Sequence, residues 1–195
     1  MATGLVLLAA GASTRLGKPK QNLQYKDESL LQRAVREAIA SVCEPVVVVV
    51  GAHAEAVMPQ IAAEPVSIVQ NPVWKEGMAS SVRAGLKALL AIEPNAAACV
   101  FMVCDQPFTD AVLLNALVEV KQTTAKGIVA SAYDATLGTP VLFDSTYFPE
   151  LLALQGQEGA KKLLLRHGQE VASINFPLGG VDIDSASDYE ALLQS

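Results

Sequence analysis

The sequence is short of cysteine and histidine, and it has neither long apolar runs nor long basic runs. Its cysteines, Cys43, Cys99 and Cys104, lack the spacing of metal ligands, so we expect buried thiols in a cytosolic protein. No apolar run approaches the roughly twenty residues that cross a bilayer, and no cationic stretch precedes the first hydrophobic segment, as it would in a secretory signal. A net charge of −6 without basic runs argues against a nucleic-acid surface. We therefore expect a cytoplasmic protein that binds neither nucleic acid nor membrane.

The chain does have the apolar residues for one large core. Hydrophobic residues make up 51% of its 195 positions, which predicts a single domain over residues 1–195. Continuous apolar runs, typical of strands buried on both faces of a parallel sheet, alternate with segments of helical periodicity. This alternation predicts an α/β fold with a doubly wound, mostly parallel sheet and helices on both faces. The expected strands are Leu5–Leu8, Val46–Val50, Val66–Val69, Ala96–Val103, Gly127–Ala132 and Val141–Phe143, and the expected helices include Leu30–Ile39, His53–Ala62 and Val112–Val120.

The N-terminal strand ends in a glycine turn that carries three cations, Arg15, Lys18 and Lys20. Gly11 and Gly17 permit backbone angles that let an anion approach main-chain N–H groups. The spacing fits neither the dinucleotide-binding Gly-x-Gly-x-x-Gly pattern nor the ATPase loop, which continues with Lys and then Ser or Thr. In an acidic chain this loop indicates a polyphosphate site, and a metal bound there needs carboxylates from elsewhere.

Three further polar segments have both a functional and an ordinary interpretation. Around Gly77, small residues precede a helix, where free N–H groups bind anions or where serine simply caps the helix. Asp105 follows a buried strand, at the end of the sheet where ligands bind in open α/β folds, or it is a turn carboxylate. Asp182 and Asp184 lie on one side of an expected final strand, before a helix with a capping box at Ser185.

The glycine loop also resembles a longer signature, the L-A-A-G-x-S-x-R-x-G-x-x-K loop of nucleotidyltransferases. The matching residues are Leu8, Ala9, Ala10, Gly11, Ser13, Arg15, Gly17 and Lys20. Asn71–Ser81 is similar to the N-P-x-W-x-x-G-M-x-x-S segment of molybdenum-cofactor cytidylyltransferases, and Asp105–Pro107 is similar to their D-x-P segment. Gly179–Leu193 resembles the D-I-D-T-P-E-D segment of nucleotidyltransferases.

Two segments depart from the pattern of that family. Relatives have Gly-x-Pro, often with histidine in the middle, where this chain has Gly138, Thr139 and Pro140. In the relatives' G-D-x-G-A-R segment, Gln157 stands in place of the aspartate and Lys161 in place of the arginine. Both departures leave the identity of the acceptor open.

The resemblance implies the Rossmann-like nucleotidyltransferase fold and a reaction in which an acceptor phosphate oxygen attacks the α-phosphorus of a nucleoside triphosphate and releases pyrophosphate. It implies Mg²⁺ as cofactor, CTP as the favoured nucleotide because Ala10 matches the cytidylyl branch, molybdopterin as acceptor and a molybdoenzyme as a partner. The implied residues are Leu8, Ala9, Ala10, Gly11, Arg15, Lys20, Asn71, Gly77 and Ser81 for the nucleotide; Arg15, Lys20 and Asp105 for catalysis; Asp105 and Asp184 for the metal; and Gly138, Thr139, Pro140 and Gly159 for the acceptor.

Two alternatives stay open. One is a nucleotidyltransferase that acts on another acceptor, such as a sugar phosphate or a polyol phosphate. The other is a catalytically silent module that holds a nucleotide or cofactor for a partner enzyme. Such a module does not need Arg15, Lys20, Asp105 and Asp184 together, so their joint presence favours an enzyme.

Overall fold

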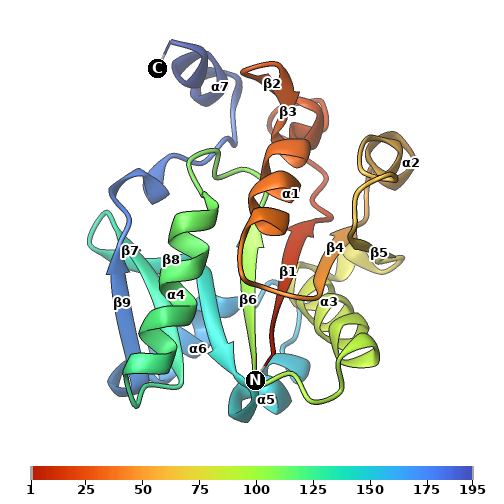
Figure 1. Ribbon diagram of the computed structural model, residues 1–195. Helices are drawn as coiled ribbons and strands as arrows, with labels where there is room; N and C mark the ends of the chain where they lie inside the picture. Colours follow the sequence, from red (N-terminus) through yellow and green to blue (C-terminus); the bar gives the residue numbers. More distant parts are fainter. Residues whose placement is uncertain (1, 195) are drawn as a thin grey trace.

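A seven-stranded sheet forms the centre of the computed structural model, which describes residues 2–194 (Figure 1). Its strands are β1 Thr3–Ala9, β4 Val46–Val50, β5 Ser67–Gln70, β6 Ala98–Val103, β7 Ile128–Tyr133, β8 Thr136–Asp144 and β9 Val171–Asn175. In the order β5-β4-β1-β6-β8-β7-β9, the first four strands are mutually parallel. Strand β8 runs antiparallel to both β6 and β7, and β9 pairs in parallel with β7.

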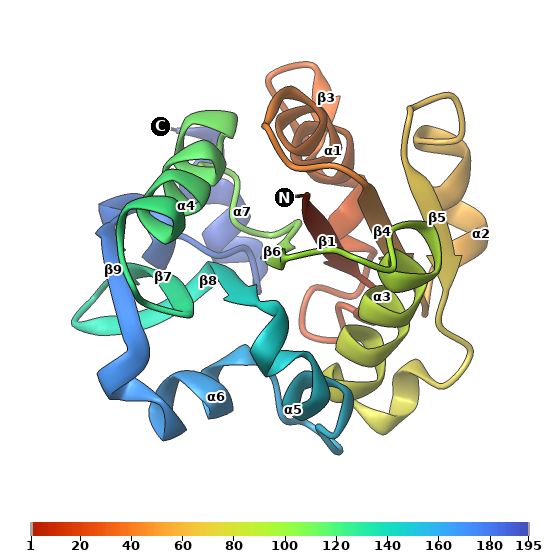
Figure 2. The ribbon, with the colours of Figure 1, turned by 60° about the horizontal axis from the view of Figure 1, so that its bottom comes forward.

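Helices cover both faces of this sheet, as Figures 1 and 2 show from two directions. The helices are α1 Leu30–Ala40, α2 Ala54–Val57, α3 Met78–Ile92, α4 Ala111–Thr123, α5 Phe148–Leu152, α6 Ala160–Arg166 and α7 Ala186–Leu193. Side chains of α1, α2 and α4 pack on one face, and those of α3, α5 and α6 pack on the other. The predicted α/β fold, with a mostly parallel sheet between two helical layers, is confirmed.

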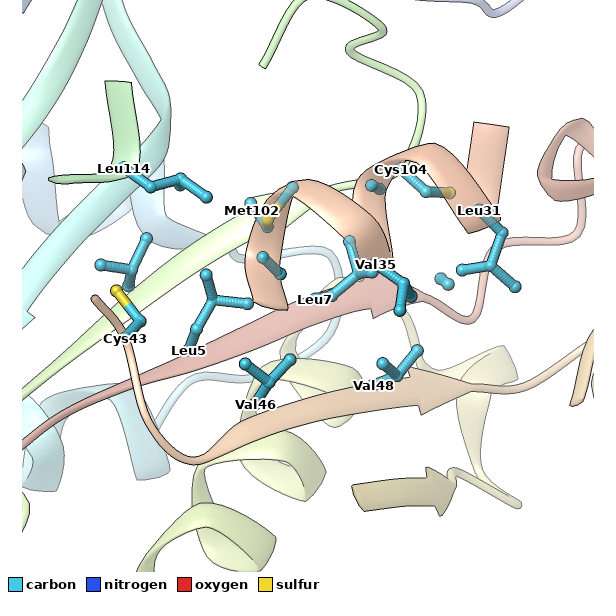
Figure 3. Packing of buried hydrophobic residues seen from close by; sticks show 14 of the residues in the cluster. Leu5, Leu7, Leu31, Val35, Cys43, Val46, Val48, Met102, Cys104 and Leu114 are labelled. Atoms are coloured by element: carbon cyan, nitrogen blue, oxygen red, sulfur yellow. The ribbon is translucent and has the colours of Figure 1, made fainter. Parts of the chain in front are cut away.

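Alternate residues of the central strands enter two separate cores, one on each face of the sheet. In β1, Leu5 and Leu7 join the core under α1 and α4, whereas Val6 joins the core under α3. Figure 3 shows the first of these cores, in which Val35 of α1 points toward the side chains of β1 and β4. Because β1 is buried on both faces, close packing fixes its position. The loop that follows β1 therefore starts from a rigid point.

Strand β8 is longer than the predicted Val141–Phe143 and includes residues 138–140. Gly138, Thr139 and Pro140 are predicted to precede this strand, whereas in the structure they belong to it. The pairing register shifts between Ala130 and Ser131 of β7, so the two strands are irregular opposite Pro140. Such a bulge accommodates a residue that has no N–H to donate to the ladder.

The final strand that was predicted around Asp182 and Asp184 is wrong, because the last strand is β9. Residues 177–180 form a 3₁₀ turn. The backbone N–H of Ile183, in the segment after it, donates to the carbonyl of Asp105 at 3.0 Å and so ties this segment to the end of β6. Ile183 is fully buried, whereas the aspartates on either side of it stay accessible. The capping box at Ser185 is confirmed.

The smaller differences between the predicted and the observed secondary structure have local causes. The stretch predicted as irregular after Lys20 contains a 3₁₀ turn, Lys20–Asn22, and a short hairpin of β2 (Gln24–Tyr25) and β3 (Glu28–Ser29). The helix predicted over residues 53–62 divides into α2 and a 3₁₀ turn that contains Pro59, which lacks a backbone N–H. The three cysteines are buried and free, as predicted. Within residues 2–194, no helix has the length and apolar character needed to cross a membrane.

Gly85 tests how closely α3 packs on the sheet. A Cβ atom at this position would lie 2.4 Å from Cγ1 of Val6 and 2.8 Å from Cγ2 of Val49. We predict that Gly85→Ala lowers the free energy of unfolding by about 1–3 kcal/mol, although alanine is the better helix former. Urea unfolding measures this effect. In the control Gly168→Ala, the added Cβ meets no atom within 4 Å, and equal stability of the two variants would contradict the packing argument.

Candidate active site

A cavity of about 390 Å³ opens at the carboxyl ends of β1 and β6. Helix α1 follows β1 on one face of the sheet and α3 precedes β6 on the other, which makes this edge a switch point where α/β folds bind ligands. The cavity is lined by Leu8–Ala12, Thr14, Lys20, Gln21, Trp74, Lys75, Gly77, Met78, Ser81, Val103–Asp105 and Gln157. These include every predicted nucleotide-binding residue except Arg15 and Asn71.

The loop after β1 is closed by Ser13. Its carbonyl accepts from the backbone N–H groups of Leu16, at 3.1 Å, and Gly17, at 3.2 Å. Its hydroxyl oxygen accepts from the backbone N–H of Lys20, at 3.0 Å. Gly17 has a φ of +72°, in the region that favours glycine. These bonds return the chain to the cavity at Lys20.

Lys20 is the centre of an ion cluster. Its Nζ contacts Oδ2 of Asp105 and lies 3.0 Å from Oδ1 of Asp184. Nη1 of Arg15 lies 3.0 Å from Oδ2 of Asp184. The Lys20 and Asp105 side chains are 17% and 16% exposed, whereas that of Arg15 is 77% exposed. The structure therefore brings together the four predicted charged residues. Lys20 and Asp105 form a largely buried inner pair, and Arg15 and Asp184 form a more exposed outer pair.

The surroundings of this cluster set its protonation. Burial lowers the pKa of Lys20, but the charge of Asp105 and hydrogen bonds to both carboxylates outweigh burial, and the net pKa is raised. Lys20 is therefore a fixed cation at neutral pH. Burial also raises the pKa of the Cys104 thiol to about 12. At Asp182, burial and then the charges of Asp184 and Asp105 raise the pKa.

The two carboxylates that contact Lys20 fit a divalent ion. Asp105 and Asp184 reach the same nitrogen, so their oxygen atoms converge on one point at the cavity. Mg²⁺ in proteins usually takes one or two carboxylates together with water and substrate phosphates. Within residues 2–194, no three His, Cys, Asp or Glu side chains gather into a metal site. The donor set thus suits an ion that protein and phosphate hold jointly.

Asn71 is 1% exposed and uses its polar atoms within the protein. Its Nδ2 donates to the hydroxyl oxygens of Ser80, at 2.8 Å, and Ser81, at 3.0 Å, and its Oδ1 accepts from the N–H of Val73, at 3.1 Å. Asn71 therefore joins the end of β5 to the first turn of α3. The structure makes it a support for the cavity wall.

The start of α3 is covered by a distant segment. Gly77 has a φ of +109°, and the N–H of Ala79 donates to the carbonyl of Gly156, at 3.1 Å. The N-cap position of α3 is Gly77, which has no side chain, so the predicted alternative of a serine cap is not observed. The segment with Gln157 consequently borders the main cavity. Gly159, predicted for the acceptor, lies in the same segment, where an added Cβ would be 3.3 Å from Met78.

A second hollow, of about 340 Å³, shares Val103 and Asp105 with the main cavity. Thr139 is the predicted acceptor residue that lines it. The Thr139 hydroxyl donates to Oε1 of Gln106, at 3.0 Å. Nε2 of Gln106 donates to the carbonyl of Gly179, at 2.8 Å, and lies 3.3 Å from Oη of Tyr133. Gln106 thus fixes three walls of this hollow.

Sequence reasoning missed two buried glutamines, Gln21 and Gln106, which are 1% and 6% exposed. Glutamine is mostly an exposed residue, so its presence alone does not indicate burial. The available signal is position, because each one directly follows a predicted charged site residue, Lys20 or Asp105.

The cationic loop, the cavity at the strand ends and the convergent carboxylates together define a protein of the nucleotidyltransferase class. The chain belongs to the family of MobA-like NTP transferase domains, whose model matches residues 5–171. The resemblance to this family that the sequence motifs indicated is therefore confirmed.

Relatives are found among curated proteins and solved structures. The chain is 30% identical to purine catabolism protein PucB of Bacillus subtilis (strain 168), over 95% of this chain and 93% of that protein. It is 46% identical to nicotine blue oxidoreductase of Paenarthrobacter nicotinovorans, over only 41% of this chain and 40% of that protein. A crystal structure of Rv0371c from Mycobacterium tuberculosis H37Rv matches with 30% identity and a TM-score of 0.85, over 100% of this chain and 98% of that one. A complex of Rv0371c with manganese matches with 28% identity and a TM-score of 0.80, over 100% of both chains.

Lys20→Met tests the ion cluster. We predict that it lowers the free energy of unfolding at pH 7 by about 1–3 kcal/mol, because Asp105 and Asp184 lose their shared cation. Because the pKa of Lys20 is higher in the folded than in the unfolded protein, the lysine stabilises the fold. This stabilisation is fully present below the pKa of the unfolded state and is lost as pH rises through the pKa of the folded state. The deficit of the variant should therefore shrink as pH rises above about 10, the ordinary pKa of lysine, because the contribution of Lys20 to stability is lost there.

Chemical denaturation at both pH values measures this deficit. The control is Lys18→Met, which changes an exposed lysine whose Nζ lies 5.5 Å from the ring centre of Tyr189, and it should alter stability by less than about 0.5 kcal/mol. A Lys20→Met deficit of the same size at both pH values would contradict an electrostatic origin.

Proposed function

We propose that the chain is a Mg²⁺-dependent enzyme that transfers a nucleoside monophosphate from a nucleoside triphosphate to a phosphorylated acceptor and releases pyrophosphate. Membership of the MobA-like NTP transferase family supports this class of reaction. The observation that carries the proposal is the meeting of Lys20, Asp105 and Asp184 beside the main cavity. Three segments far apart in the sequence supply these groups, so local sequence alone does not account for the cluster.

In this mechanism the protein positions the substrates and neutralises charge. The main chain of Ala9–Gly11 and the turn of Gly77–Ser81 receive the base and ribose. Arg15 and Lys20 hold the triphosphate, and Lys20 stabilises charge on the α-phosphoryl group and on the leaving pyrophosphate. A phosphomonoester has a second pKa of about 6, so the attacking acceptor is already largely dianionic at neutral pH and needs no general base.

Asp105 and Asp184 are the proposed ligands of Mg²⁺, which supplies further charge neutralisation at the phosphate oxygens. The manganese complex of the relative Rv0371c supports a divalent ion as cofactor. Because Lys20 contacts the same two carboxylates, its ammonium is shared between them and the triphosphate when the nucleotide binds.

We propose CTP as the nucleotide, because Ala10 lines the cavity and its methyl group limits how closely a base approaches the end of β1. For the acceptor we propose a molecule with one phosphate at its reacting end, with molybdopterin favoured over sugar and polyol phosphates. Among the described residues that line the second hollow, Asp105, Asp134 and Asp182 are charged and none is Lys or Arg. A second phosphate would be repelled there, whereas N–H donors of a pterin would find oxygen acceptors.

We further propose that residues 1–195 act as one nucleotidyltransferase domain in the cytoplasm and pass the product to a molybdoenzyme. The match of the family model to most of this range supports the single domain.

The metal site gives a direct test of catalysis. We predict that Asp105→Asn and Asp184→Asn each lower kcat at least about a hundredfold. The double variant should be little worse than either, because both residues act through one ion. Pyrophosphate release at saturating Mg²⁺ measures turnover, thermal melting verifies folding, and Asp182→Asn is the milder control. Near-normal turnover by folded Asp105→Asn would remove the metal site from the mechanism.

A second prediction concerns the nucleotide. In parallel titrations with Mg²⁺, CTP should bind more tightly than GTP, because Ala10 restricts the space for the base. A pyrophosphate-release screen of four nucleotides against molybdopterin, a sugar phosphate and a polyol phosphate then identifies the acceptor. Tighter GTP binding would contradict the choice of CTP, and nucleotide binding without release from any acceptor would favour the silent module.

A further inference from the structure

Gln21 directly follows Lys20, lines the main cavity and is 1% exposed. Neither the signature loop nor the ion cluster accounts for it. A buried glutamine has to satisfy two N–H donors and one carbonyl oxygen, and leaving such groups without partners costs free energy. Its hydrogen bonds therefore indicate what the side chain contributes.

Both donors of this amide bond to the backbone at the end of β1 and just after it. Nε2 of Gln21 donates to the carbonyl of Ala9, at 2.8 Å, and to the carbonyl of Gly11, at 3.1 Å. Only the nitrogen of an amide can donate to carbonyl oxygens, so the orientation of the side chain is fixed. Oε1 is buried and has no hydrogen-bond partner among residues 2–194. The nitrogen alone thus explains why a glutamine fits here.

The intervening carbonyls are held from another segment. The carbonyl of Ala10 accepts from the N–H of Ala52, at 3.2 Å, and that of Ala12 lies 3.0 Å from Nε2 of His53. The carbonyls of residues 9 to 12 therefore contact Gln21 and the segment after β4 in strict alternation. Alternation of this kind is the hydrogen-bond pattern of an extended strand.

No sheet partner supplies these bonds. The ladder of β1 with β6 ends at the pair Leu8–Val103, and the ladder with β4 ends at the pair Ala9–Val50. Beyond those pairs, Gln21 and the segment after β4 take over the backbone that lines the cavity. A side-chain amide that replaces a neighbouring strand as hydrogen-bond partner holds the backbone in place. It also leaves open the space beside the backbone that a strand would fill.

We propose that Gln21 is a positioning residue, which holds the main chain of Ala9–Gly11 in the conformation that receives the nucleotide. It also ties the backbone next to Lys20 to the end of β1, and so fixes the point from which the Lys20 ammonium reaches the phosphates. This role rests on the nucleotidyl transfer proposed above.

Two variants separate the donors from the shape of the side chain. Gln21→Met keeps the length and loses both donors, whereas Gln21→Glu keeps the shape and replaces the nitrogen by oxygen. Each should lower kcat/KM for the nucleoside triphosphate about tenfold to a hundredfold. Deuterium exchange should rise over residues 9–20 and stay unchanged in α3 and α4. Relative to the unmodified protein at the same pH, the kcat/KM of Gln21→Glu should recover as pH falls, because a protonated carboxyl group can donate to one of the two carbonyls.

The matched control is Gln24→Met. It makes the same change at an exposed glutamine whose Nε2 donates a hydrogen bond, at 3.3 Å, to the carbonyl of Asn22. This variant should match the unmodified protein in all measurements. Unchanged exchange over residues 9–20 in Gln21→Met would overturn the proposal. A lower melting temperature with unchanged kcat/KM would also overturn it, since Gln21 would then contribute to stability alone.

The proposed transfer reaction can fail independently of this role. If the unmodified protein releases no pyrophosphate with any acceptor, the proposed function is wrong, and nucleotide affinity replaces kcat/KM as the readout for Gln21. Faster exchange over residues 9–20 together with weaker nucleotide binding then supports the positioning role, and wild-type values of both refute it.

Discussion

The ammonium of Lys20 joins three parts of the chain at one point: it comes from the loop after β1 and contacts Asp105 at the end of β6 and Asp184 in the segment before α7. Without a cation between them, Asp105 and Asp184 would be two like charges in a partly buried place, which costs free energy. The carboxylates therefore determine where Lys20 lies, and the loop follows. Under the proposed function, a metal–triphosphate needs the same three groups, so the structural and the chemical requirement coincide.

The elements predicted best from the sequence are those whose residues are buried throughout. Val46–Val50 is buried at every residue, and its run of five valines marks the strand to its exact bounds. Strand β9 lies at the sheet edge and is partly exposed, so no apolar run signals it. The antiparallel insertion of β8 between β6 and β7 depends on contacts between distant strands and on a bulge opposite Pro140. Periodicity within one segment contains neither kind of information.

The candidate site divides in the same way. Lys20 and Asp105, to which the resemblance assigns roles in catalysis, lie in contact in the structure. Asn71 and Thr139 are predicted to contact ligands. In the structure their hydrogen-bonding groups contact Ser80, Ser81 and Gln106, and Thr139 also lines the second hollow. A motif shows that a polar side chain is required at a position, and it does not show whether that side chain faces a ligand or supports the wall behind it. Only the set of hydrogen bonds, which depends on the whole fold, distinguishes the two.

The two hollows that meet at Asp105 differ in charge, and this difference bears on how a transfer reaction would run. The main cavity has Lys20 and Lys75 in its lining, whereas the second hollow has Asp134 and Asp182. Under the proposed function, the polyphosphate belongs on the cationic side, and the acceptor turns its single phosphate toward the boundary and its uncharged body toward the carboxylates. Charges of opposite sign on the two sides orient an anionic substrate before any contact forms. The difference in charge between the two hollows then sets the direction from which the acceptor attacks, and this effect adds to that of any single catalytic residue.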